Sequence, residues 1–185
     1  MIPYAEPSSK SLLNESESYV CWSDRHSFYE RFGFKAWSTE FYLSYTNAFT
    51  DNPIQISCSL KRGFNSQIPS LFEKNSESNL VRESESWNLC ASERLQTFYL
   101  EEKGNLKAYA LIGKGKDLRS ICHEIIAIDQ NYLLQLAFQL PPNTIFLLSE
   151  KVYKKFPNFQ KATQGIQALA KNSVLTDWIY GLDSC

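Results

Sequence analysis

Apolar and polar residues alternate along this chain with two different periods, which together predict a mixed sheet with helices on its faces. Residues 95–101 and 106–112 have the period of strands, and the Lys-Gly-Asn between them favours a hairpin turn. Residues 129–140 have the period of a helix that begins at a capping aspartate and ends before two prolines. The predicted fold class is therefore α+β.

The remaining apolar runs extend this pattern toward both ends of the chain. A short helix is predicted to begin at Ser23 or Asp24 and to end at Gly33, which takes the left-handed conformation. The polar residues 46–53 predict a linker, and residues 1–17 have no clear period. The other predicted strands are 19–23, 37–45, 54–58, 119–128, 144–149 and 177–182, and the other predicted helices are 67–74, 83–92, 151–156 and 163–171.

Composition narrows the classes of partner. The net charge of −1 leaves no basic footprint for a nucleic acid, so none is expected. No basic and apolar leader begins the chain and no apolar run approaches ~20 residues, so no membrane is expected and the predicted location is cytoplasmic. The five cysteines lie far apart, which favours buried reduced thiols and predicts no metal site.

The most informative motif is Ser-Phe-Tyr-Glu-Arg-Phe-Gly-Phe at residues 27–34, which places Tyr29 on a short helix between two strands. A degraded copy at residues 152–159 carries Tyr153 and also follows an apolar run. Two similar units at long spacing indicate a duplicated domain. The expected division is a loosely ordered segment 1–17, a C-terminal fragment of a first domain at 18–53, and a second, divergent domain at 54–185.

The element order and the tyrosine motif resemble the GNAT family, the GCN5-related N-acetyltransferases, and in particular the C-terminal part of a tandem-GNAT protein. The resemblance implies a mostly antiparallel sheet flanked by helices, acetyl-CoA as cosubstrate, and N-acetyl transfer to a primary amine of a small molecule or peptide. It also implies that Tyr29 protonates the departing thiolate and that Glu124 takes a proton from the amine, directly or through water.

The residues themselves leave other interpretations open. Tyr29 with Phe28 and Phe32 is also typical of simple helix packing, which is the favoured interpretation from the residues alone. Neighbouring residues on a strand point to opposite faces, so only one of His123 and Glu124 lines any one cleft, and Glu124 is preferred. A satisfied polar residue on the exposed side of the strand explains Glu124 equally well.

One departure from the family favours an alternative function. The family binds the CoA pyrophosphate at an R/Q-x-x-G-x-G/A turn before a helix, but residues 127–133 have no glycine there and place the anionic Asp129 at the site. The alternative is a non-catalytic GNAT-like accessory or oligomerisation module. Its exposed sheet edge would be covered by homodimerisation or by residues 1–17.

Overall fold

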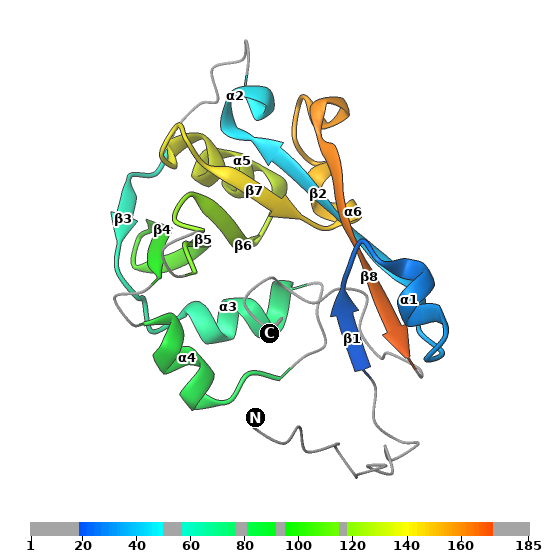
Figure 1. Cartoon of the computed structure of the whole chain (residues 1–185). Helices are drawn as coiled ribbons and strands as arrows, with labels where there is room; N and C mark the ends of the chain where they lie inside the picture. Colours follow the sequence, from blue (N-terminus) through cyan, green and yellow to red (C-terminus); the bar gives the residue numbers. More distant parts are fainter. Residues whose placement is uncertain (1–18, 50–56, 77–80, 92–94, 115–117, 172–185) are drawn as a thin grey trace, which may run out of the picture.

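The strands form a single eight-stranded sheet in the order β3-β4-β5-β6-β7-β2-β8-β1 (Figure 1). The computed structural model describes residues 19–49, 57–76, 81–91, 95–114 and 118–171. Neighbouring strands are antiparallel except for the parallel pair β6–β7. The strands are β1 (Tyr19–Trp22), β2 (Lys35–Ser44), β3 (Leu60–Arg62), β4 (Gln96–Glu102), β5 (Asn105–Ile112), β6 (Ile121–Ala127), β7 (Ile145–Leu148) and β8 (Thr163–Lys171).

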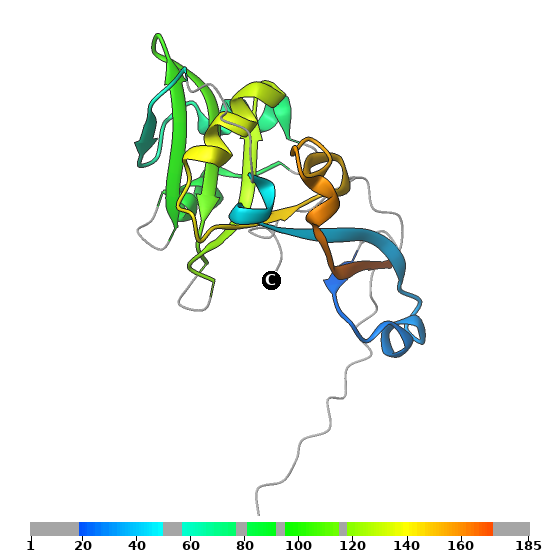
Figure 2. The ribbon, with the colours of Figure 1, turned by 90° about the horizontal axis from the view of Figure 1, so that it is seen from above.

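Helices cover both faces of the central strands and create two separate cores (Figure 2). On one face, α3 and α4 pack on side chains of β5 and β6 such as Tyr109 and Ile126. On the other face, α5 packs on β5 and β6, which contribute Ala110 and Ile125, and α6 packs on β2 and β7. The described helices are α1 (His26–Glu30), α2 (Tyr45–Ala48), α3 (Ile68–Asn75), α4 (Ser84–Cys90), α5 (Gln130–Gln139), α6 (Glu150–Tyr153) and the 3-10 helix η1 (Phe159–Lys161).

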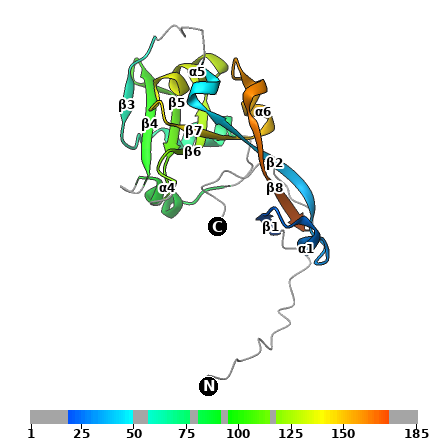
Figure 3. The ribbon, with the colours of Figure 1, turned by 45° about the horizontal axis from the view of Figure 1, so that its top comes forward.

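The long strands β2 and β8 leave this body as an arm that carries β1 and α1 (Figure 3). β2 pairs with β7 through Phe41–Ser44, inside the body, and with β8 from Lys35 onward. The predicted left-handed Gly33 is confirmed, with a φ of 83° between α1 and β2. Segments 18–53 and 54–185 thus contribute to one sheet. Their origin in two domain copies stays a prediction, because shared packing does not test ancestry.

The predicted helix at residues 163–171 is wrong, because this segment is the strand β8. β8 lies between β1 and β2 and pairs with both, which satisfies its backbone on two sides. Ala168, Leu169 and Ala170, toward the C-terminal end of β8, are buried. Tertiary pairing therefore overrides the helix propensity of these residues.

Several boundaries also differ from the prediction. The linker expected at residues 46–53 begins with helix α2, which Ser44 caps by accepting a hydrogen bond from the Asn47 amide. The predicted cap of α1 is wrong: Arg25 occupies that position without a side-chain cap, and Ser23 accepts from the Arg25 amide. The short strand β3 was not predicted. Residues 54–56 and 177–182 lie outside the described residues.

An irregularity in the arm brings Tyr42 over Gly165. The β2–β8 register shifts between Thr39 and Phe41, which is a site where strands bend. A Cβ atom added to Gly165 would lie 2.1 Å from the Tyr42 ring. The Tyr42 hydroxyl donates to Glu40, whose side chain is buried within the sheet. The close approach of strand and ring therefore requires glycine at position 165.

We predict that Gly165→Ala destabilises the fold by about 1–3 kcal/mol, because the new methyl group collides with the Tyr42 ring. The effect is read from urea unfolding. The matched control is the same substitution in a Tyr42→Ala background, where the ring is absent and the cost falls to a small fraction. Equal costs in the two backgrounds would contradict the steric explanation.

We predict that Glu40 makes stability fall as pH rises. Burial raises the pKa of Glu40 to about 7 from an ordinary 4.5, and the Tyr42 hydrogen bond only partly opposes this. The folded chain therefore holds a proton that the unfolded chain loses, so the destabilisation grows from pH 4.5 and is complete above pH 7. Glu40→Gln removes it and is more stable than wild type by about 1–3 kcal/mol at pH 8.5.

The quantity measured for Glu40 is the difference in unfolding free energy between Glu40→Gln and wild type at pH 5 and at pH 8.5. Taking this difference cancels the contributions of the other titrating groups to the unfolding free energy. His123 is one of them, and its lowered pKa makes stability rise with pH. A difference that is the same at both pH values would rule out the ionisation of Glu40 as its cause.

Candidate active site

Glu124 lies in the middle of β6 with a side chain that has no exposed surface. Two guanidinium nitrogens of Arg82 donate hydrogen bonds to the Glu124 carboxylate, at 3.0 Å to Oε1 and 2.5 Å to Oε2. The Tyr109 hydroxyl, from β5, also donates to Oε1. Glu124 is therefore an ion-paired and hydrogen-bonded carboxylate in the interior.

Two aromatic rings enclose the guanidinium of Arg82. Its central carbon lies 4.2 Å from the ring centroid of Phe72 on α3 and 4.9 Å from that of Trp87 on α4. Only 4% of the Arg82 side chain is exposed. A desolvated cation over aromatic faces and a bidentate carboxylate are each strong interactions. This cluster, which we call the Arg82 cage, joins α3, α4, β5 and β6.

His123 is buried beside this cage but takes no part in it. Leu111 pairs with Glu124 and Ile112 with Cys122, so a bulge leaves His123 without a partner on β5. Neither ring nitrogen has a hydrogen-bond partner in the described structure. Burial and, to a lesser extent, Lys114 lower the pKa of His123 to about 4, so the imidazole is neutral at pH 7.

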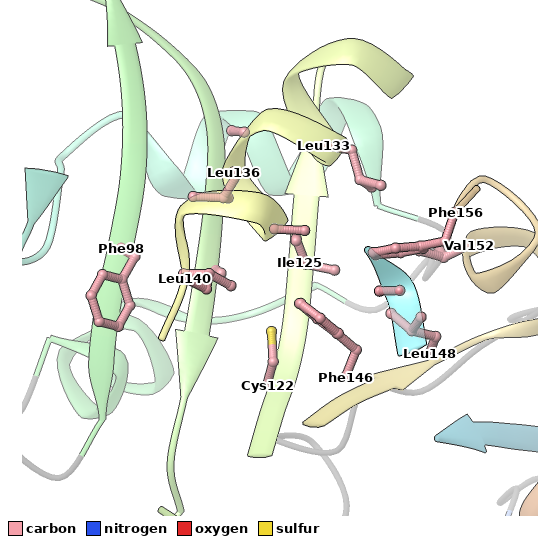
Figure 4. Packing of buried hydrophobic residues seen from close by; sticks show 14 of the residues in the cluster. Phe98, Cys122, Ile125, Leu133, Leu136, Leu140, Phe146, Leu148, Val152 and Phe156 are labelled. Atoms are coloured by element: carbon pink, nitrogen blue, oxygen red, sulfur yellow. The ribbon is translucent and has the colours of Figure 1, made fainter. Parts of the chain in front are cut away.

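The parallel strands β6 and β7 separate just after they begin. They pair only at Ile121 with Ile145 and at Cys122 with Phe146. Apolar side chains fill the space beyond, and the rings of Phe146 and Phe156 lie 5.3 Å apart (Figure 4). The residues packed there are Ile125, Leu133, Phe146, Leu148, Val152 and Phe156, and all six are buried. The splay between the strands is therefore part of the core.

The N-terminus of α5 is occupied by the protein itself. The predicted cap Asp129 is confirmed, and its carboxylate accepts a hydrogen bond of 3.0 Å from the Tyr132 amide. An anion bound at a helix N-terminus needs these amides and the positive end of the helix dipole. The carboxylate uses one donor and adds a negative charge, so the residues here do not fit the pyrophosphate of CoA.

The structure does not bring Tyr29 and Glu124 together. Tyr29 lies on α1, at the end of the arm, while Glu124 lies in β6 within the body (Figure 3). The Tyr29 ring contacts Phe28 at 5.2 Å and Phe34 at 5.7 Å between centroids. Tyr153 stacks on Phe41 at 4.0 Å. Both tyrosines thus take part in aromatic packing.

Sequence reasoning found Glu124 but missed its partners. A carboxylate inside an apolar strand is a visible signal, whereas Arg82 precedes α4 in a polar stretch and lies 42 positions away. Tyr109 lies in a strand rich in apolar residues and has no distinguishing neighbour. Glu40 in β2, a buried acid in an aromatic strand, carried the same signal as Glu124 and was also missed.

The described part of the chain offers neither a metal-binding cluster nor a membrane-spanning helix. No group of three histidine, cysteine or acidic side chains could hold a metal ion there. Burial raises the pKa of the Cys122 thiol, which makes it a poor nucleophile at neutral pH. None of the described helices is long and apolar enough to cross a lipid bilayer.

Comparisons with known proteins identify the fold. No protein-family profile and no curated protein matches the chain. Solved structures do match, among them GCN5-related N-acetyltransferases from Anabaena variabilis (TM-score 0.53, 14% identity) and Kribbella flavida (TM-score 0.53, 11% identity). A conserved Enterococcus faecalis protein of unknown function, described as a probable N-acyltransferase, has a TM-score of 0.55 at 12% identity.

The matches to these three proteins cover most of this chain but less than half of each of them. The covered shares of this chain are 83%, 90% and 83% for the Anabaena, Kribbella and Enterococcus proteins, against 45%, 44% and 44% of those proteins. At these identities the likeness concerns the fold. The chain therefore has a GNAT-like fold, that of the GCN5-related N-acetyltransferases.

Proposed function

We propose that this chain is a non-catalytic, accessory unit of a GNAT-type acyltransferase, which supports a catalytic partner domain. The observation that carries the proposal is the Arg82 cage, in which the carboxylate of Glu124 is committed to Arg82 and Tyr109. A general base must accept a proton from the substrate or from a positioned water. Because the Glu124 carboxylate is already bound by Arg82 and Tyr109, we assign it a role in stabilising the interior and not in proton transfer.

The region where the GNAT family binds CoA also supports a non-catalytic function. Apolar side chains occupy the splay of β6 and β7, and Asp129 occupies the N-terminus of α5. The apolar side chains leave little room between the strands for the extended arm of CoA, and the negative charge of Asp129 repels its phosphates. The residues present do not fit acetyl-CoA, so we derive no chemical step through it.

The free edge of the arm supports a partner domain. Among the described strands, β1 has a neighbour on one side only, and an edge strand is a template for further pairing. Phe28 on α1 and Phe32 in the turn that follows this helix are half-exposed, at 50% and 53%. Because the Enterococcus, Anabaena and Kribbella proteins are about twice as long as the matched region, we propose that a second GNAT-type domain covers this edge.

A second candidate function is acetyl-CoA-dependent N-acetyl transfer to a primary amine by the chain itself. It is favoured by the neighbours of the same fold that are named as N-acetyltransferases. Tyr29 would be the acid and Glu124 the base, which requires Glu124 to leave Arg82 and α1 to approach β6. We therefore place this function second.

We predict that acetyl-CoA raises the melting temperature of the chain no more than ADP or free CoA does at equal concentration. A ligand that binds only the folded state must raise the midpoint, and the filled splay gives the thioester arm no additional contacts. ADP is the control for contacts of the nucleotide half of CoA. A saturable additional shift with acetyl-CoA, accompanied by thiol release in the presence of primary amines, would establish the second function instead.

We predict that Glu124→Gln destabilises the chain by about 3–5 kcal/mol, because it leaves the buried Arg82 cation unpaired. The double variant Arg82→Met/Glu124→Leu recovers most of the loss, since it removes both charges. Urea unfolding measures both. The matched control is Glu101→Gln at the exposed Lys61–Glu101 pair, which costs less than about 1 kcal/mol.

The catalytic alternative gives a different result for the same variants. Active-site carboxylates are commonly dispensable for stability, so under that alternative Glu124→Gln loses activity and unfolds like wild type. An unchanged unfolding midpoint for Glu124→Gln would therefore remove the main support for an accessory function.

A further inference from the structure

Trp37 occupies an unusual position on β2. Ala36 pairs with Leu169 and Ser38 with Ala168, so Trp37 is an extra residue in the β2–β8 ladder. A bulge of this kind redirects a side chain out of the regular alternation, and bulges are frequent next to binding sites. The indole is only partly buried and has no ring contact among the described residues.

Trp37 lines two cavities. The larger, about 560 Å³, lies between β2 and α6, which pack side by side (Figure 2). Besides Trp37 it is lined by Ser38, Thr39, Ser149, Glu150, Lys151 and Lys154. The smaller, about 380 Å³, lies where α1 is joined to β2, beside the end of β8, and is lined by Gly33, Lys35, Ala36, Trp37, Ala170 and Lys171.

The lining is cationic, although the chain as a whole has a net charge of −1. Each cavity is lined by two lysines, and Glu150 is the one acidic residue among the described residues that line them. Glu150 accepts from Lys154 at 2.6 Å and so forms an ion pair with that lysine. The hydroxyls of Ser38 and Thr39 add neutral donors beside the indole.

We propose that the two cavities on either side of Trp37 bind a nucleoside phosphate, with the base on the indole and the phosphates near the lysines. An aromatic face is the general platform for a base, and stacking is largely independent of base identity. Ammonium groups recognise phosphates as point charges. This inference concerns a different region from the Arg82 cage and does not rest on the proposed accessory function.

Two other classes of anionic ligand, inorganic phosphates and acidic peptides, fit the same observations less well. Inorganic phosphate or pyrophosphate would use the lysines and leave the redirected indole without a function. An acidic peptide would meet a pair of cavities rather than the continuous sheet edge or groove that extended peptides use. A ligand with one flat apolar part and one polyanionic part uses both features.

The test is isothermal titration of the chain with ADP at low ionic strength, beside adenosine and pyrophosphate. We expect saturable binding of ADP, and binding at least about fivefold weaker for each of the other two, because each lacks one half of the contacts. Trp37→Ala lowers the ADP affinity by about fivefold to a hundredfold, as for loss of one stacked base.

A second pair of variants tests the charges independently of Trp37. Lys151→Ala/Lys171→Ala removes one lysine from each cavity and weakens ADP binding by at least about fivefold, with a shallower salt dependence. Lys74→Ala/Lys155→Ala, at exposed lysines outside the cavities, leaves the affinity unchanged. Melting curves verify that each variant folds.

The proposal is overturned if ADP does not bind at millimolar concentration, or if pyrophosphate binds as tightly as ADP. It is also overturned if the Lys151/Lys171 variant, or a folded Trp37→Ala variant, binds ADP like wild type. None of these results bears on Glu124→Gln, so failure here is distinguishable from failure of the accessory function.

Discussion

The charge of Glu124 imposes the constraint on which the body of this protein depends. A carboxylate without solvent must be paired and hydrogen-bonded, or it costs several kcal/mol. Arg82 and Tyr109 meet that need. Because the guanidinium then needs its own enclosure, Phe72 and Trp87 close over it, and this fixes how α3 and α4 lie on the sheet.

The same interaction limits the chemistry available to the body. A fold and a reactive site are separable, since a site depends on a few side chains held at the right place and protonation state. Here the GNAT-like strand order persists while the splay of β6 and β7 is packed as core. Under the proposed accessory function, a filled interior and an ion-paired carboxylate favour stability over the access to substrate that catalysis needs.

Sequence predicted those elements whose signals are local. The Asp129 cap and the turn at residues 103–105 depend on a few neighbouring residues, and both were confirmed. Residues 163–171 were assigned to a helix because nothing local indicates that β1 and β2 pair with them. Glu124 was recognisable as a charge in an apolar strand, but a contact with Arg82 across 42 positions leaves no periodic trace.

Irregular pairing explains why concave surface lies on the arm. Where β6 and β7 separate, α5 and α6 supply enough apolar side chains to fill the gap. β2 and β8 have two register shifts, and the buried residues Ala168, Leu169 and Ala170 of β8 belong to neither of the two core clusters. The bulge changes the direction of the Trp37 side chain, and the space between β2 and α6 is left partly open, so Trp37 remains partly exposed between lysines. Recognition of a ligand is thus more compatible with the arm than with the filled body, since a binding site needs unoccupied volume beside polar groups.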